Sequence, residues 1–162
     1  MLQTLSGIRF VYPTAEPRSY ALAGGALSSV WFDRVAGMAP SNPEHTQSVE
    51  ESAARLNSLI DQLVTSGVPS EQIVLGGFSM GGGISLQTAA RSPHRLGAVF
   101  ALSSYLCDDS RLWQKLQLGQ EGTATDATPF SRGLVPVYMA HGSADDFVRL
   151  AITSSLHDCP PD

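Results

Sequence analysis

The sequence predicts an α/β fold in which helices cover both faces of a mostly parallel sheet. Strand-like segments alternate with helical segments along the chain, and the strand-like segments are apolar throughout, as in parallel sheets that are buried on both sides. The chain has 162 residues, of which 43% are hydrophobic and 15% charged, values that are typical of one globular domain. We therefore expect a single domain over residues 1–162.

The N-terminal part is expected to form one strand, an irregular segment and one helix. IRFVYP, residues 8–13, is a short β-rich run that a proline stops, which predicts a buried strand. Residues 14–45 carry loop signals and predict an irregular excursion. Ser48 and Glu51 match the S-x-x-E capping box, so a helix is expected to open at Ser48 and to end at Gly67 in a left-handed turn. Its apolar face recurs at helical spacing and comprises Val49, Ala53, Leu56, Leu59, Ile60, Leu63 and Val64.

The rest of the chain predicts three more strands and a second helix. QIVLGG at 72–77, GAVFALSS at 97–104 and VPVYMA at 135–140 are apolar runs with the length of buried strands. A helix is expected from about residue 82 to 91, where Ser-Pro stops it. The segment 105–134 is polar and reads as loop with one short helix, SRLWQKL.

The stretch LGGFSMGGG, residues 75–83, places five glycines around one serine. It contains G-x-S-x-G directly after a strand and directly before a helix, the context of a nucleophile elbow. We expect Ser79 in a strained backbone conformation, with Gly77 and Gly81 required because no Cβ fits beside the neighbouring backbone. The N–H of Met80, at the start of the helix, is then a donor of an oxyanion hole. The sequence therefore predicts Ser79 as a catalytic nucleophile.

Other glycine-rich turns between a strand and a helix cradle phosphates. A dinucleotide site needs G-x-G-x-x-G and an acidic residue at the end of the next strand, but that strand ends in Ser103-Ser104. A P-loop needs G-K-[ST], and no lysine is near, because Lys115 is the only lysine of the chain. Both patterns fit less well than the nucleophile elbow.

A serine nucleophile needs a base and a carboxylate that orients the base. In this fold class the chain order is serine, then an acid, then histidine. Asp145 and Asp146 both follow the strand at 135–140 and are equal candidates by position. Because ligands bind beyond the carboxyl ends of parallel strands, we expect Ser79 and residues 141–146 to be neighbours.

Composition excludes several other classes of function. The net charge is −5 and the basic residues are scattered, which argues against a nucleic-acid surface. Cys107 and Cys159 match no metal-site spacing and are expected to be free thiols. No apolar run reaches the length of a membrane span, and the N-terminus lacks the features of a secretory signal, so we expect a cytoplasmic protein.

Several motifs, in matching order and spacing, resemble the acyl-protein thioesterase and lysophospholipase group of α/β-hydrolases. They are YPTAEPRSY, SSVWFDR, LIDQLVTSGVPSEQIVLGGFSMGGG, GAVFALSSYL and HGSADDFV. The resemblance implies a serine hydrolase of acyl esters and thioesters, S-acylated proteins among its substrates, that needs no metal or cofactor. It selects Asp145 over Asp146 as the acid of the triad, through the pattern H-G-x-x-D. It also implies that Trp31 lies near the acyl site.

The sequence departs from this group at both ends. The group's first motif, a strand ending in H-G followed by a glycine-rich loop that supplies a second oxyanion donor, is absent, and that strand lies in the middle of the group's sheet. After Val148 the likeness fades, so we expect the last strand to be missing and residues 149–162 to form a divergent, disordered tail. His157 is the only histidine after Asp145 and the only candidate base that keeps the triad order. The alternative to an active enzyme is therefore a catalytically impaired form that acts by binding.

Overall fold

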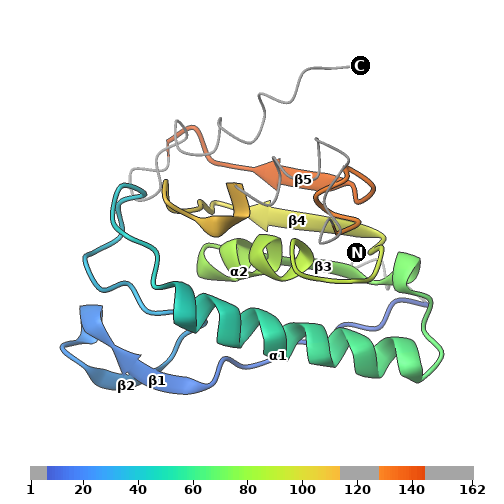
Figure 1. The fold of residues 1–162 in the computed structure, drawn as a ribbon, viewed down its shortest axis with the longest axis horizontal. Coiled ribbons are helices and arrows are strands. Elements are labelled where there is room, and N and C mark those ends of the chain that lie inside the picture. The colour runs from blue at the N-terminus through green and yellow to red at the C-terminus, as the bar shows by residue number, and fades with distance from the viewer. Residues whose placement is uncertain (1–6, 114–127, 145–162) are drawn as a thin grey trace, which may run out of the picture.

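The computed structural model describes residues 7–113 and 128–144 (Figure 1). The elements in chain order are β1 (Pro17–Tyr20), the 3-10 helix η1 (Ala21–Ala23), β2 (Ala26–Ser29), α1 (Thr46–Thr65), the 3-10 helix η2 (Ser70–Gln72), β3 (Val74–Phe78), α2 (Met80–Ala89), β4 (Ala98–Leu102) and β5 (Val137–Ala140). Within these residues no helix is both long and apolar enough to cross a membrane.

The main sheet is parallel, as predicted, and its strand order is β3-β4-β5. The strands predicted at 72–77, 97–104 and 135–140 are therefore confirmed, with bounds shifted by at most two residues. Only the central strand β4 contains fully buried residues, Val99 and Ala101. The prediction of strands buried throughout is wrong for β3 and β5, because in the described residues each of them pairs on one side only.

Both long helices lie on the same side of this sheet. Helix α2 packs directly on β3 and β4, and α1 packs against α2; Figure 1 shows them as successive layers. One cluster joins the sheet to α2 and includes Leu86, Ala89, Ala90, Val99 and Ala101. A second cluster joins α1 to α2 and consists of Val49, Ala53, Leu56 and Ile84.

The opposite face of the sheet carries no helix in the part of the chain that is described. Side chains alternate along a strand, so Val74 and Phe78 of β3 and Tyr138 of β5 point away from α2. Their exposed fractions are 57%, 68% and 63%. The predicted helical cover on both faces is thus found on one face only within residues 7–113 and 128–144.

The strand predicted at residues 8–13 is not formed. Ile8, Phe10 and Tyr12 are 55%, 60% and 84% exposed, and the segment has no strand partner among the described residues. A strand needs a neighbour for its backbone hydrogen bonds and a face to bury. Since the segment has neither, its apolar composition does not make it a strand.

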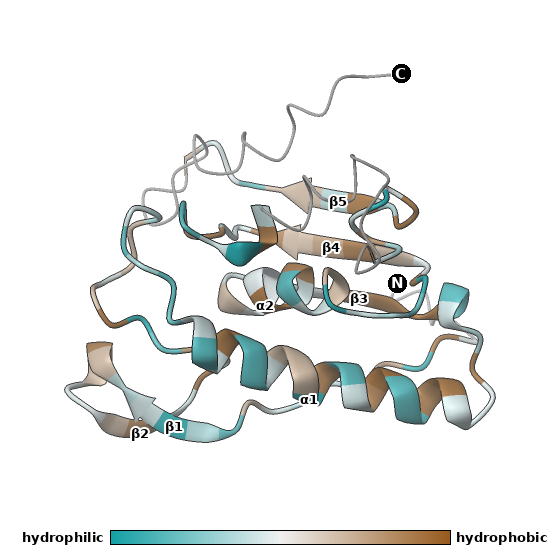
Figure 2. Cartoon of the chain, viewed as in Figure 1, coloured by the Kyte–Doolittle hydropathy of each residue, from teal (hydrophilic) through white to brown (hydrophobic). Residues whose placement is uncertain are grey.

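Helix α1 confirms the predicted helix but not its capping box. The helix begins at Thr46 with His45 as its N-cap, so Ser48 lies inside the first turn, where its Oγ donates to the carbonyl of His45 at 3.0 Å. Glu51 instead accepts a hydrogen bond from Arg18 at 3.3 Å. The C-terminus is as predicted, because Gly67 has φ +99°. Figure 2 shows hydrophilic and hydrophobic residues alternating around α1, as the predicted apolar face requires.

The excursion predicted at residues 14–45 contains a regular element that was missed. β1 and β2 pair antiparallel as a hairpin, with Tyr20 opposite Ala26. Gly24 and Gly25 in the connection have φ +64° and +86°, values that glycine adopts at little cost. The Gly-Gly pair between the two strands was the available sequence signal.

Candidate active site

Ser79 occupies a backbone conformation that few residues other than glycine adopt. Its φ is 52° and its ψ −121°, between the end of β3 at Phe78 and the start of α2 at Met80. A non-glycine residue in such a region costs about 1–3 kcal/mol and persists where the surrounding structure enforces it, often at functional sites. The strained turn predicted at Ser79 is therefore confirmed.

The two elbow glycines play different parts in this turn. A Cβ at Gly77 would lie 2.4 Å from the carbonyl carbon of Gly81 and 2.6 Å from its oxygen, so the backbone leaves no room for a side chain. A Cβ at Gly81 would meet no atom of the described residues within 4 Å. The close contact predicted for Gly77 is therefore observed, whereas for Gly81 the described residues show none, because the contact is between the backbone of Gly81 and the Cβ position of Gly77.

The first turn of α2 has unoccupied N–H groups beside Ser79. The amides of Gly82 and Gly83 donate to the carbonyl of Ser79 at 3.0 and 3.2 Å. The amides of Met80 and Gly81 have no hydrogen-bond acceptor among residues 7–113 and 128–144. These groups and the helix dipole favour negative charge, so the arrangement can stabilise an oxyanion on a group bound to Ser79.

The ends of the three parallel strands form one edge. The amide of Ser79 donates to the carbonyl of Leu102 at 2.8 Å, and the amide of Ser103 donates to the carbonyl of Ala140, also at 2.8 Å. Ser79, Ser103 and His141 are thus the first residues beyond β3, β4 and β5. Ser103 is a second residue with a left-handed backbone, with φ 44°. Sequence reasoning did not single out Ser103 as a site residue, although the motif GAVFALSSYL contains it.

The other predicted triad residues lie outside the described residues. Asp145 and Asp146 directly follow residue 144, the last described position after β5, and His157 lies further along the chain. Residues 141–144 share the sheet edge with Ser79, with the end of β4 between them. The order of the strands brings the segment before Asp145 to the edge that carries Ser79.

Trp31, predicted near the acyl site, packs mainly against the core. It is half-buried beside the cluster that joins α1 to α2, and its carbonyl accepts a hydrogen bond from the Ser52 hydroxyl. The next residue, Phe32, reaches α2, where its Cζ is 3.7 Å from the position of a Cβ at Gly83. Phe32 and Asp33, but not Trp31, line the pocket described next.

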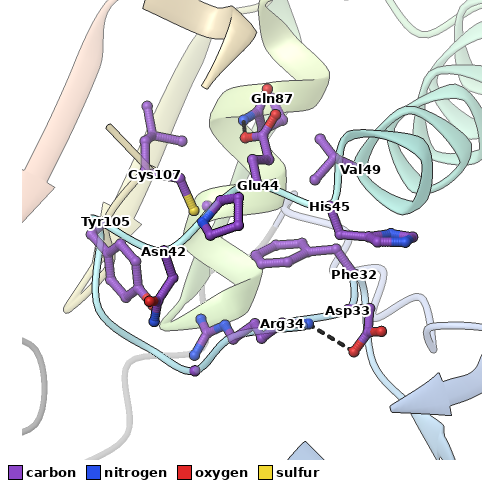
Figure 3. A pocket seen from close by; sticks show the side chains of 14 residues that line it. Phe32, Asp33, Arg34, Asn42, Glu44, His45, Val49, Gln87, Tyr105 and Cys107 are labelled. Atoms are coloured by element: carbon purple, nitrogen blue, oxygen red, sulfur yellow. Dashed lines mark hydrogen bonds between the residues drawn. The ribbon is translucent and has the colours of Figure 1, made fainter. Parts of the chain in front are cut away.

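A pocket lies along α2 beyond Ser79 (Figure 3). Its walls come from residues 32–45, from Val49 of α1, from Gly83 and Gln87 of α2, and from residues 105–107. Gly83 and Gln87 follow Ser79 by four and eight residues and so lie on its side of the helix. Figure 3 shows the Arg34 guanidinium between two rings, 5.6 Å from the centroid of Phe32 and 5.3 Å from that of Tyr105. Sequence reasoning missed this pocket, because its walls come from segments far apart in the chain.

The half-buried thiol of Cys107 lines the same pocket. Burial raises the pKa of the thiol to about 11, and the nearby carboxylates of Glu44 and Asp109 contribute to the rise. The thiol is therefore protonated at neutral pH and is a poor nucleophile. The described residues contain no group of three or more His, Cys, Asp and Glu side chains that could hold a metal ion.

A serine lies next to a histidine at the start of α1. The Oγ of Ser48 is 2.9 Å from Nδ1 of His45. This oxygen also accepts a hydrogen bond from the amide of Asp33 at 2.9 Å, and Ser48 is only 2% exposed. Because its hydrogen-bonding capacity is used and no substrate can reach it, this pair serves the structure and not catalysis.

Comparison with known proteins identifies the family of this chain. The sequence profile of the phospholipase/carboxylesterase family matches residues 2–159. The chain belongs to this family. The match passes Val148, where the likeness was expected to fade, and it includes the segment that carries His157.

Relatives within the phospholipase/carboxylesterase family confirm the predicted resemblance. The chain is 38% identical over 170 residues to lysophospholipase-like protein 1 of Mus musculus, across 97% of this chain and 66% of the mouse protein. It is 32% identical over 148 residues to acyl-protein thioesterase 1 of Yarrowia lipolytica, across 91% of this chain and 60% of the yeast protein. The chain thus spans less than two thirds of the length of these relatives.

Solved structures confirm the predicted α/β-hydrolase fold. A variant of SOBER1 from Arabidopsis thaliana is similar with a TM-score of 0.78 at 21% identity, over 94% of this chain and 68% of the plant protein. Acyl-protein thioesterase 2 of Zea mays is similar with a TM-score of 0.67 at 26% identity, over 88% of this chain and 62% of the maize protein.

Proposed function

We propose that this protein is a serine hydrolase of carboxylic esters or thioesters that acts through an acyl-Ser79 intermediate. The observation that carries the proposal is the strained turn at Ser79, which holds a serine at the N-terminus of α2 next to the amides of Met80 and Gly81, for which residues 7–113 and 128–144 provide no acceptor. Strain at a residue that precedes a helix N-terminus suits a nucleophile, because its attack develops negative charge on the carbonyl oxygen of the substrate, which N–H groups can stabilise.

The reaction follows from these groups. The Oγ of Ser79 attacks the acyl carbon while a base takes its proton, and the carbonyl oxygen becomes an oxyanion that the amide of Met80 stabilises. The leaving group departs with that proton, and water then hydrolyses the acyl-serine by the same route. Asp145 orients the base, and His157 is the candidate base, since it keeps the order serine, acid, histidine.

The substrate class follows from membership of the family and from the names of the relatives. Acyl esters are the chemistry that the family name states, and the Yarrowia relative is named as an acyl-protein thioesterase. S-acylated proteins, processed in the cytoplasm, are therefore the proposed macromolecular substrates, and the reaction itself needs no cofactor. Trp31 remains a proposed contact of the acyl group.

Ester hydrolysis by the purified chain and four variants tests this proposal. We expect the wild type to hydrolyse 4-nitrophenyl butyrate and Ser79→Ala to reduce kcat/KM to the background rate, because the nucleophile is lost. Ser66→Ala, an exposed serine at the end of α1, is the matched control and keeps the wild-type rate. Asp145→Asn is expected to lower kcat/KM by about 10⁴-fold, whereas Asp146→Asn keeps it close to the wild-type value.

Two results would contradict the proposal. Equal rates for the wild type and Ser79→Ala would exclude Ser79 as the nucleophile. A folded wild-type chain with no hydrolysis at all would favour the alternative of a catalytically impaired protein that acts by binding.

A further inference from the structure

Ser103 shares with Ser79 a feature that no other described non-glycine residue has. These two serines alone among residues 7–113 and 128–144 combine a side chain with positive φ, 52° at Ser79 and 44° at Ser103. The left-handed region costs a non-glycine residue about 1 kcal/mol or more. A glycine at position 103 would make the same turn without that cost. The presence of a serine there suggests that its side chain has a function.

The turn at Ser103 has a structural effect of its own. It leads the chain from β4 to Ser104, whose Cβ lies 2.8 Å from the position of a Cβ at Gly82 in the first turn of α2. Ser104 is 2% exposed and packs tightly there. This packing explains why the backbone bends at residue 103, but a glycine would allow the same bend.

The register of the sheet places Ser103 beside the proposed nucleophile. Phe78 is paired with Leu102, and the amide of Ser79 donates to the carbonyl of Leu102 at 2.8 Å, so Ser79 lies beside the backbone that leads from β4 into Ser103. The order β3-β4-β5 also puts Ser103 between Ser79 and the strand that precedes Asp145. Ser103 therefore lies at the sheet edge between the proposed nucleophile and the end of β5, where the bound ester would expose its leaving group.

The hydroxyl of Ser103 is available for a bound molecule. Ser103 is half-exposed, and its Oγ has no hydrogen-bond partner among the described residues. Its backbone amide is already used by the carbonyl of Ala140 at 2.8 Å. The hydroxyl is therefore the hydrogen-bond donor of Ser103 that is available to a substrate.

We propose that the Ser103 hydroxyl donates a hydrogen bond to the leaving-group atom of the ester, and this inference rests on the proposed function of Ser79. In the acylation step the Ser79 Oγ bonds to the acyl carbon and the bond from that carbon to the leaving oxygen breaks. The electron pair stays on the leaving oxygen, which receives the proton that the base took from Ser79. Ser103 keeps its own proton and stabilises the charge on the leaving oxygen until that transfer is complete.

Two esters with the same acyl group and different leaving groups test this role. Nitrophenolate leaves 4-nitrophenyl butyrate without help, whereas the alkoxide of ethyl butyrate needs both a proton and stabilisation. The measured quantity is the ratio of kcat/KM for ethyl butyrate to kcat/KM for 4-nitrophenyl butyrate, which does not depend on the fraction of folded enzyme. Ser103→Gly is expected to lower this ratio about three- to tenfold, the effect of one lost hydrogen bond.

The matched variant Ser103→Thr separates catalysis from stability. It keeps the hydroxyl but places a β-branched residue at positive φ, so its midpoint in urea falls while the ratio of kcat/KM values stays within about twofold of the wild type. Ser103→Gly relieves the strain, so its midpoint rises while the ratio falls. A purely structural role would move the midpoints and leave both ratios unchanged.

The possible failures are distinguishable. If the wild type hydrolyses both esters and Ser103→Gly keeps the wild-type ratio, the role of Ser103 is refuted while the function of Ser79 stands. If the wild type hydrolyses neither ester, the proposed function fails and the role of Ser103 fails with it.

Discussion

At the scale of single residues, the turn around Ser79 depends on one glycine more than on its neighbours. The Cβ position of Gly77 is filled by backbone atoms of Gly81, whereas the corresponding position at Gly81 is open among the described residues. The motif G-x-S-x-G predicts the turn but treats its two glycines alike. The difference depends on which glycine's Cβ position faces the backbone of the other, and the motif does not contain that information.

Paired alanine substitutions test this asymmetry. Gly77→Ala is expected to lower the free energy of unfolding by about 1–3 kcal/mol, because backbone has to move to admit the Cβ. Gly81→Ala is expected to raise it by about 0.5–1 kcal/mol, because alanine is the better residue within a helix. Urea denaturation of both variants measures the two values, and equal losses would contradict the account.

The pocket thiol offers a pH-dependent prediction at the same scale. The pKa of the Cys107 thiol is raised from 9.0 to about 11, first by burial. Alkylation of Cys107 by iodoacetamide is therefore expected to be slow at pH 8 and to accelerate through pH 11, because the thiolate is the reactive form. Peptide mapping separates Cys107 from Cys159, and urea-unfolded protein is the control that reacts at the lower pH.

The same shift has a consequence for stability. A pKa raised in the folded state means that the folded protein holds this proton more tightly than the unfolded chain. The contribution of the protonated thiol to the free energy of unfolding is present below pH 9 and is lost as pH rises towards 11.

The alkylation experiment also has a contradicting outcome. If Cys107 of the folded protein reacts at pH 8 as fast as it does in the unfolded protein, the thiol is not buried.

At the scale of elements, helix α1 was predicted correctly, but its N-terminus is stabilised by a contact other than the one that the sequence suggests. Ser48 and Glu51 have the spacing of a capping box, but the helix starts two residues earlier and buries Ser48. The Ser48 hydroxyl accepts from the amide of Asp33 and so ties α1 to the segment before it. The apolar periodicity of the helix could be predicted, whereas this long-range partner could not.

Alanine substitutions at these two positions distinguish the explanations. Ser48→Ala is expected to lower the free energy of unfolding by about 1–3 kcal/mol, because it leaves the Asp33 amide without its partner. Glu51→Ala is expected to cost about 0–1 kcal/mol, the range for an exposed ion pair, here with Arg18. Urea denaturation measures the free energy of unfolding of both variants. If both lose 1 kcal/mol or more, the capping box explains the start of α1 better than the contact with Asp33.

At the scale of the whole molecule, the predicted burial of an apolar segment is confirmed where neighbouring elements cover that segment. β4 and α2 lie between other elements, so their apolar composition is matched by burial. Residues 8–13 have similar composition but no pairing partner among the described residues, and their side chains remain exposed. Composition states that a segment can be buried, and only the arrangement of the other segments decides whether it is.

The same limit applies to the candidate site. The nucleophile could be predicted because its signal is local, within one strand, one turn and one helix. The pocket with Arg34, Tyr105 and Cys107, and the position of Ser103 beside Ser79, depend on strand order and register. Such features join segments that lie far apart in the sequence, so no motif marks them.

We propose that the bend before α2 makes Ser79 chemically reactive, and covalent labelling is the measurement that checks this. The folded chain is incubated with a fluorophosphonate, digested, and mapped by mass spectrometry. We predict one modified serine, Ser79, with no labelling of Ser79→Ala and no labelling of the urea-unfolded wild type. A folded wild type that stays unmodified, or that carries the label on another serine, would contradict it.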